Sequence, residues 1–379
     1  MFKSSFIPSI CEHVAVPPPV RDAIVLRYVE NEVQPDGTQR TFAITDFDVQ
    51  PCDYDCLVEA IRRPDVNIPL QIWNGKTVDR NFGDASSGPY LNASSSALES
   101  HFTSKAIGLV RGGWLPSAMA ATRDDSAVIL DRNIIGAITH YLEAGAPRGR
   151  QPDFLELFAG RPILISPAIC ALEGNGRTLP DHATAVDQLT EIGNKLRRAL
   201  PDARILDGAE IAARLDVLIE GCRDQIERGQ QFLLELAPRL SPVGRARRAA
   251  FWDDTIEAAD RHGVPRRSLV VLAVLSAGLM PNGSCPARLV LKSSPDYSEG
   301  DAFNAMLDLT ALDILIRGIA NLPDRRMQLC TGDKGLALFW CGVQASDFRV
   351  EGGFCRYSLT PNLAILPADM VEEWLERTK

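Results

Sequence analysis

The chain has 379 residues, of which 45% are hydrophobic and 23% charged, and its formal net charge is −9. These values are typical of a soluble globular protein with two domains, or of one domain with large insertions. The negative charge argues against a general nucleic-acid coat protein. It permits an enzyme that binds nucleic acid through a local basic patch.

No apolar run reaches the roughly 18 residues that a membrane-spanning helix needs, so we expect no membrane interaction. Residues 1–5 lack the extended apolar core of a signal peptide. The nine cysteines are scattered without a Cys-x-x-Cys pair, which favours reduced thiols. We therefore expect a cytoplasmic protein.

Residues 1–122 contain no motif with an evident function, and we expect an N-terminal extension or a small separate domain. Strands are predicted over 23–29 and 42–49, and a helix over 54–63. Gly, Ser, Asn and Asp dominate residues 74–100, which predicts a loop there.

A buried strand meets a helix at Asp131. Residues 127–130 form a short apolar run, and apolar residues then recur with helical spacing from 134 to 142. In open α/β sheets this junction is the crevice where ligands bind. Asp131 is therefore either the N-cap of the helix or a functional group.

The next unit repeats this plan. Residues 163–165 form a second short apolar run, and Ser166 followed by Pro167 is typical of a helix start. Glu173 is expected about two turns into this short helix, which Gly174 ends.

Residues 181–294 are predicted to be a helical insertion, with helices over 183–200, 208–220, 223–240, 251–262 and 268–279 and no strand. Basic residues concentrate there: Lys195, Arg197 and Arg198; Arg245, Arg247 and Arg248; Arg261, Arg266 and Arg267. They are either solvated helix faces or a positively charged wall that holds a phosphate backbone. The expected nucleic-acid contacts are Arg245, Arg247, Arg248, Arg266 and Arg267.

The α/β pattern resumes in the last part of the chain. A long amphipathic helix is predicted over 301–319, where Asp301, Asn304 and Asp308 are three and four residues apart and share one face. A strand over 327–330, a turn at 331–333 and a helix from 334 follow. Strands over 354–359 and 363–366 and a helix from 368 complete the chain.

Carboxylates from distant segments are thus expected at one edge of a parallel sheet. Strands deliver Asp131, Glu173 and Asp333 to that edge, and the preceding helix delivers Asp308. Such groups repel one another unless they are protonated or neutralised. Mg²⁺ prefers oxygen ligands, and it can activate water beside a phosphodiester. The few histidines disfavour zinc chemistry.

The ordered set formed by Asp131-x-Asn133, Glu173, Asp308 and Thr331-x-Asp333 resembles the PIN-like nuclease domains. The resemblance implies a three-layer, Rossmann-like α/β domain with a parallel sheet, formed by residues 123–180 and 295–379. It also implies an acidic cluster that binds Mg²⁺ or Mn²⁺ and hydrolyses phosphodiester bonds, mostly in RNA. The metal-binding and catalytic acids would be Asp131, Glu173, Asp308 and Asp333, and the supporting residues Asn133, Thr331 and Asn304.

Several alternatives stay open. Asp301 or Asp313 could replace Asp308 as the third acid. Another metal-dependent phosphohydrolase is a second interpretation, although the phosphoaspartate type normally needs aspartate where this chain has Asn133. A third is a non-enzymatic protein with a degenerate site, whose helical block binds a partner. A homo-oligomer or a regulatory protein partner also stays open.

Overall fold

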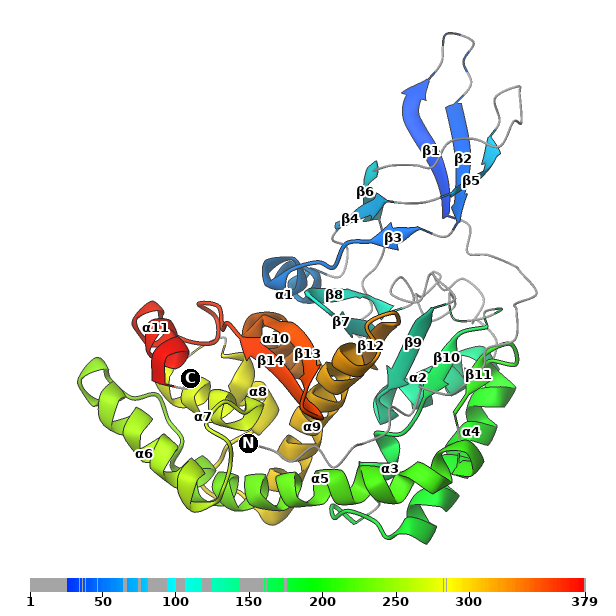
Figure 1. Ribbon diagram of the computed structural model, residues 1–379. Helices are drawn as coiled ribbons and strands as arrows, with labels where there is room; N and C mark the ends of the chain where they lie inside the picture. The colour runs from blue at the N-terminus through cyan, green and yellow to red at the C-terminus, as the bar shows by residue number, and fades with distance from the viewer. Residues whose placement is uncertain are drawn as a thin grey trace.

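The structure is a computed structural model that describes residues 26–33, 35, 37, 39–45, 47–63, 67–73, 76–80, 94–99, 106–117, 125–143, 158, 160, 162–173, 176–206, 208–281, 283 and 285–377. A mixed α/β body holds most of these residues, and N-terminal strands project from it (Figure 1). Within the described ranges, no helix has both the length and the apolar character that crossing a bilayer requires.

A six-stranded sheet forms the centre of the body, in the order β11-β10-β9-β12-β7-β8. Its strands are β11 (Arg204–Ile205), β10 (Leu164–Ser166), β9 (Ser126–Leu130), β12 (Arg326–Thr331), β7 (Ile107–Val110) and β8 (Gly113–Pro116). The first four run parallel, whereas β7 is antiparallel to β12 and β8 is antiparallel to β7. The α/β class with a mostly parallel sheet is therefore confirmed.

Both faces of this sheet are covered by helices. Successive side chains of a strand point to opposite sides, so neighbouring residues enter two different cores. On β9, Val128 and Leu130 pack into a core with α2 (Arg132–Glu143) and the end of α4 (His182–Ala199). Ala127 and Ile129 face the other core, which contains α9 (Glu299–Asn321). The body therefore has helix, sheet and helix layers.

The helical block consists of α4, α5 (Gly208–Leu236), α6 (Arg248–Arg261), α7 (Leu269–Leu279) and α8 (Pro286–Leu291), with the 3-10 turns η3 (Ala237–Arg239) and η4 (Arg245–Arg247). The expected break near residue 221 is wrong, because α5 runs unbroken for 29 residues. Cys222 and Ile226 are buried on this helix, so core packing continues past the position where a break was expected. All residues of α7 are buried, as its apolar sequence indicates.

The central sheet also crosses the boundaries expected from the sequence. Strands β7 and β8 come from the region expected to be an extension, and β7 pairs with β12 from Ile107 to Val110. Strand β11 lies within the stretch expected to be purely helical, and it pairs with β10. It is too short, at two residues, to produce a periodic signal.

Two small antiparallel sheets form the N-terminal projection (Figure 1). One contains β1 (Leu26–Val33), β2 (Gln39–Thr45) and β5 (Lys76–Arg80); the other contains β3 (Asp48–Val49), β4 (Asn67–Trp73) and β6 (Ser94–Glu99). The predicted loop over 74–100 is therefore wrong where β5 and β6 lie, and the strand over 42–49 is split. The predicted helix over 54–63 is confirmed as α1 (Tyr54–Arg62).

The C-terminal part contains α10 (Lys334–Val343), a hairpin of β13 (Ala345–Glu351) and β14 (Phe354–Leu359), and α11 (Ala368–Arg377). The strand predicted over 363–366 is wrong. The backbone N–H groups of Ile365 and Leu366 both donate to the carbonyl oxygen of Asn362, which closes a turn instead. Strand β13 escaped prediction because most of its residues are exposed and polar.

Candidate active site

Asp131 and Thr331 lie side by side at the ends of β9 and β12. The two strands pair in parallel up to Leu130 and Cys330, and the N–H of Asp131 then donates to the carbonyl oxygen of Cys330 at 3.0 Å. Thr331 is fully buried, and its Oγ1 donates to Oδ2 of Asp131 at 2.7 Å. The register of the sheet thus places this hydroxyl against this carboxylate.

The Thr331 hydroxyl also contacts the next acid. It accepts a hydrogen bond from the backbone N–H of Asp333 at 3.0 Å. Asp333 is the N-cap of α10, since its Oδ1 accepts from the N–H of Leu336 at 2.9 Å. One buried hydroxyl therefore connects the Asp131 carboxylate with the backbone of the turn that carries Asp333.

Asp131 has the capping role considered for it, and its functional role stays a prediction. Its carboxylate accepts hydrogen bonds from the backbone N–H groups of Arg132 and Asn133, so it caps α2. Burial raises the pKa of Asp131, and the nearby Asp333 raises it further, whereas the hydrogen bonds from Thr331 and the two amides oppose this rise. The side chain of Asn133 is exposed.

Glu173 ends a helix that is shorter than expected. Helix α3 (Cys170–Glu173) has only one turn, because residues 168 and 169 form a turn before it. The Sγ of Cys170 contacts the carbonyl oxygen of Leu130 at 3.7 Å, which holds α3 against the end of β9. Burial and the nearby Asp131 raise the pKa of Glu173 to about 7, although Arg132 lies 3.7 Å from its carboxylate and opposes the rise.

Asp308 reaches the same place from α9. Burial and the Asp333 carboxylate raise the pKa of Asp308 to about 8, and Asp131 and Glu173 contribute smaller repulsions. The ammonium of Lys292 opposes these effects. Asp308 is therefore within electrostatic reach of all three other candidate acids.

The two alternative acids on α9, Asp301 and Asp313, form hydrogen bonds with groups outside the acidic cluster. Asp301 forms a capping box with Ser298, whose Oγ donates to Oδ2 of Asp301 at 2.7 Å. Asp313 is half-buried in a separate polar cluster, where Gln225 donates to Oδ2 and the Tyr357 hydroxyl contacts Oδ1 at 3.5 Å. Of the three aspartates considered, only Asp308 faces the other acids. Asn304, one turn before it, is exposed.

The donor chemistry of this site fits a hard divalent cation. Its groups are four carboxylates and a hydroxyl, all oxygen donors, which suits Mg²⁺ or Mn²⁺ better than zinc. The side chains do not already form a ligand shell. In the described part of the chain, no three His, Cys, Asp or Glu side chains come together closely enough to hold an ion. Metal binding therefore remains a prediction.

Two cationic residues beside the acids were missed in the sequence. Arg132 directly follows Asp131 and pairs with Glu173. Its position next to Asp131 in the sequence could therefore have indicated that it lies beside the acids. Lys292 follows α8 and affects Asp308 across 16 positions of sequence (308 − 292). No spacing rule connects those two residues, because only the packing of α8 brings them together.

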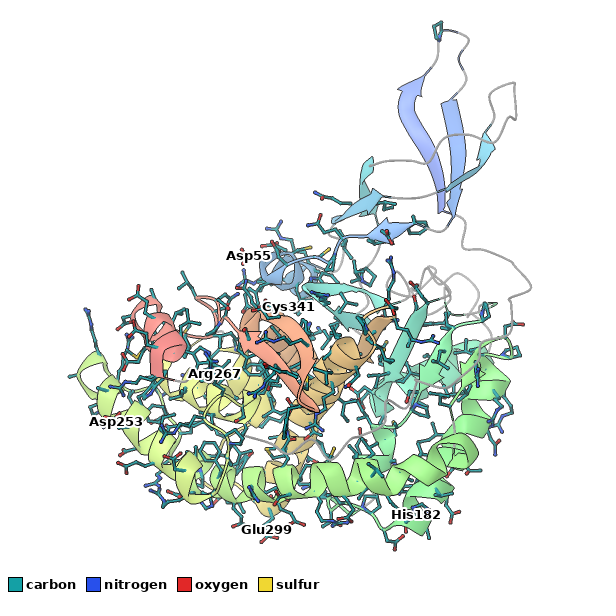
Figure 2. All side chains as sticks on the ribbon, viewed as in Figure 1. Asp55, His182, Asp253, Arg267, Glu299 and Cys341 are labelled. Atoms are coloured by element: carbon teal, nitrogen blue, oxygen red, sulfur yellow. The ribbon has the colours of Figure 1, made fainter. Side chains whose placement is uncertain are left out.

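The basic residues of the helical block do not form one wall. Figure 2 shows His182 of α4 and Asp253 of α6 at opposite ends of the body, so the basic residues of these helices are separated. Arg248 donates to both carboxylate oxygens of Asp369 at 2.9 Å, and Arg266 pairs with Asp260. Arg245 and Arg247 are exposed on η4. Nucleic-acid binding by these arginines and Arg267 stays a prediction.

Comparison of the chain with protein-family models, curated proteins and solved structures found no match. The resemblance to PIN-like nucleases therefore depends on the ordered acidic residues alone, and it stays a prediction. What the structure adds is that Asp308 lies within electrostatic reach of Asp131, Glu173 and Asp333, beside one end of the central sheet.

Proposed function

We propose that this protein is a metal-dependent nuclease that hydrolyses phosphodiester bonds in RNA. The observation that carries the proposal is the placement of four acids from separate segments of the chain beside one end of the central sheet. Thr331 connects Asp131 to the turn of Asp333, and Asp308 lies within electrostatic reach of Asp131, Glu173 and Asp333. A structural role does not explain all four. Asp131 and Asp333 cap helices, whereas Glu173 and Asp308 are partly or largely buried beside other acids.

The repulsion predicts a bound cation. Burial and neighbouring carboxylates raise the pKa of Glu173 to about 7 and that of Asp308 to about 8, far above the usual range of carboxyl groups. Strongly perturbed groups that share one place are candidates for function. A dication held by these oxygens would favour their ionised forms and remove the electrostatic penalty.

When bound, Mg²⁺ or Mn²⁺ lowers the pKa of a water molecule and stabilises charge on the phosphate. The oxygens of Asp131, Asp308 and Asp333 would hold such an ion. Thr331 fixes the orientation of Asp131 through its 2.7 Å hydrogen bond. Glu173, with a pKa of about 7, is suited to accept a proton from the attacking water near neutral pH.

Cleavage of single-stranded RNA with Mn²⁺ or Mg²⁺ tests this function. We expect Asp131→Asn to lower the cleavage rate by at least about a hundredfold, the usual cost of losing a transition-state contact. Asparagine keeps the cap of α2, so the fold is retained. The matched control is Asp324→Asn, because Asp324 is an exposed aspartate in the turn before β12, at the opposite end of that strand. Full activity of Asp131→Asn, or no metal-dependent cleavage by the wild type, would contradict the proposal.

A further inference from the structure

Helix α8 packs tightly against the turn that carries Asp333. A Cβ atom built on Gly335 would lie 2.6 Å from the Cβ of Leu289 and 3.2 Å from Oδ1 of Asp333. Only glycine permits this approach of the two helices, since real Cβ contacts are essentially never shorter than 3.0 Å. Leu289 nevertheless keeps 51% of its surface exposed. Helix α8 therefore forms part of the rim beside the acids.

The position of α8 is fixed from its other side by Arg288. The guanidinium donates to the carbonyl oxygens of Ala277 at 2.7 and 3.0 Å and of Pro281 at 3.0 Å, which lie at and beyond the end of α7. Helix α7 is fully buried. The end of α8 is therefore held by the core of the helical block and does not depend on a surface loop.

Lys292 follows α8 in a conformation that normally selects glycine. It is the C-cap, with φ 49° and ψ 38°, and its N–H donates to the carbonyl oxygen of Arg288 at 2.9 Å. A side chain in this left-handed region strains the backbone, and glycine avoids that strain.

The side chain of Lys292 is exposed, and it interacts electrostatically with Asp308. In the described part of the chain, no carboxylate lies close enough to its ammonium to form an ion pair. A cation held beside an acidic site, without an ion-pair partner of its own, is available to an anionic ligand. In a nuclease that ligand is a phosphate of the substrate backbone.

We propose that Lys292 binds a phosphate oxygen of the nucleic-acid backbone at the rim of the acidic cluster, so that the helical block supplies a substrate-binding residue to the α/β site. This inference rests on the proposed nuclease function. The neighbouring exposed face of Leu289 would lie along the same strand of nucleic acid. Lys292 has the point charge suited to a single phosphate contact.

The binding of single-stranded RNA by inactive Asp131→Asn protein tests the inference without any cleavage. We expect Lys292→Gly in this background to weaken binding about fivefold to tenfold at low salt. The slope of log K against log salt should become less steep by about 0.7, the value for one released counterion on a single strand. Lys292→Arg should stay within about twofold of the parent, because it retains the charge.

Gln344→Gly is the matched control for the backbone. Gln344 is also a C-cap in the left-handed region, with φ 45° and ψ 56° at the end of α10. Both glycine substitutions relieve the same kind of strain, so neither should lower the melting temperature. Only Lys292→Gly should change RNA affinity and its salt dependence.

The outcomes separate this inference from the proposed function. An unchanged salt slope in Lys292→Gly, with wild-type protein that still binds and cleaves RNA, overturns the role of Lys292 alone. An unchanged slope, together with tighter Mn²⁺ binding when Lys292→Gly is made in the wild-type protein, also overturns it, because Lys292 would then only neutralise the carboxylates. Wild-type protein that neither binds nor cleaves RNA overturns both.

Discussion

The Thr331 hydroxyl donates to Oδ2 of Asp131 at 2.7 Å and accepts from the N–H of Asp333 at 3.0 Å. This one group thereby links two acids that are 202 positions apart (333 − 131). It sits at the end of β12, where the parallel pairing with β9 fixes its distance from Asp131. The orientation of the site therefore depends on a buried residue that carries no charge.

Thr331→Val should remove the hydrogen bond that orients Asp131 without changing the charge of the site. Valine keeps the shape of the side chain but leaves the Asp333 N–H without its partner, which costs about 1–3 kcal/mol of unfolding free energy. We expect RNA cleavage to fall about tenfold to a hundredfold, as for other groups that orient a metal ligand. Thr331→Ser, which keeps the hydroxyl, should retain most activity. Equal activity of the valine and serine variants would show that the hydroxyl does not orient Asp131.

The close packing of α8 on α10 predicts opposite results for two glycines. Gly335→Ala should lower the unfolding free energy by about 1–3 kcal/mol, because its Cβ would overlap Leu289. Gly136→Ala in α2 should raise it by about 0.5–1 kcal/mol, because nothing lies within 4 Å of the added Cβ and alanine favours helix. Denaturant unfolding measures both. Similar stability of the two variants would contradict the contact between α8 and α10.

The raised carboxyl pKa values predict that metal-free protein loses stability as pH rises. Asp308 has a folded-state pKa of about 8 against an ordinary aspartate value of 3.8, so the folded state keeps a proton that the unfolded state has released. The resulting stability is fully present below about pH 4 and is lost as the pH rises towards 8. At about 1.4 kcal/mol for each pKa unit, the loss is on the order of a few kcal/mol.

Thermal unfolding between pH 5 and 8, with and without Mn²⁺, measures this loss. The metal-free wild type should melt at progressively lower temperature, and Mn²⁺ should reverse most of the fall at pH 8. Asp308→Asn cannot ionise, so its melting temperature should fall less over the same range. A wild type and variant with parallel pH profiles would argue against crowding at Asp308.

Substitutions of Asp301 and Asp308, both on α9, should have different effects on stability and cleavage. Asp301→Ala removes the capping box with Ser298, and we expect a loss of about 1 kcal/mol in stability with unchanged metal-dependent cleavage. Asp308→Asn should lose cleavage while the fold is kept. Cleavage rates and melting temperatures of both variants decide the matter. If only Asp301→Ala lost cleavage, Asp301 and not Asp308 would be the acid that cleavage requires.

The parts of the fold that the sequence predicts well are those with strong local patterns. The apolar runs of β9 and β12 are buried on both faces, and the acids at their ends lie where such strands give way to helices. Prediction from the sequence failed where contacts with distant parts of the chain determine the local structure. The break expected in α5 did not occur because Cys222 packs in the core, and β11 exists only through its pairing with β10.

The same distinction applies to the site. Asp131 and Asp333 could be predicted because a strand–helix junction is a local pattern. Glu173 was found at a helix whose length was overestimated, since the turn at residues 168 and 169 has no distinctive sequence signal. Lys292 could not be predicted, because its place beside Asp308 depends on the contact between Leu289 and Gly335.

Calorimetric titration of metal-free protein with Mn²⁺ at pH 7, in buffers of different ionisation enthalpy, tests the central claim most directly. With pKa values of about 7 and 8, Glu173 and Asp308 hold protons at this pH that a bound cation must displace. We predict one Mn²⁺ bound with release of about one proton, and loss of this binding in Asp131→Asn. No binding by the wild type, or equal binding by Asp131→Asn without proton release, would contradict a shared carboxylate site.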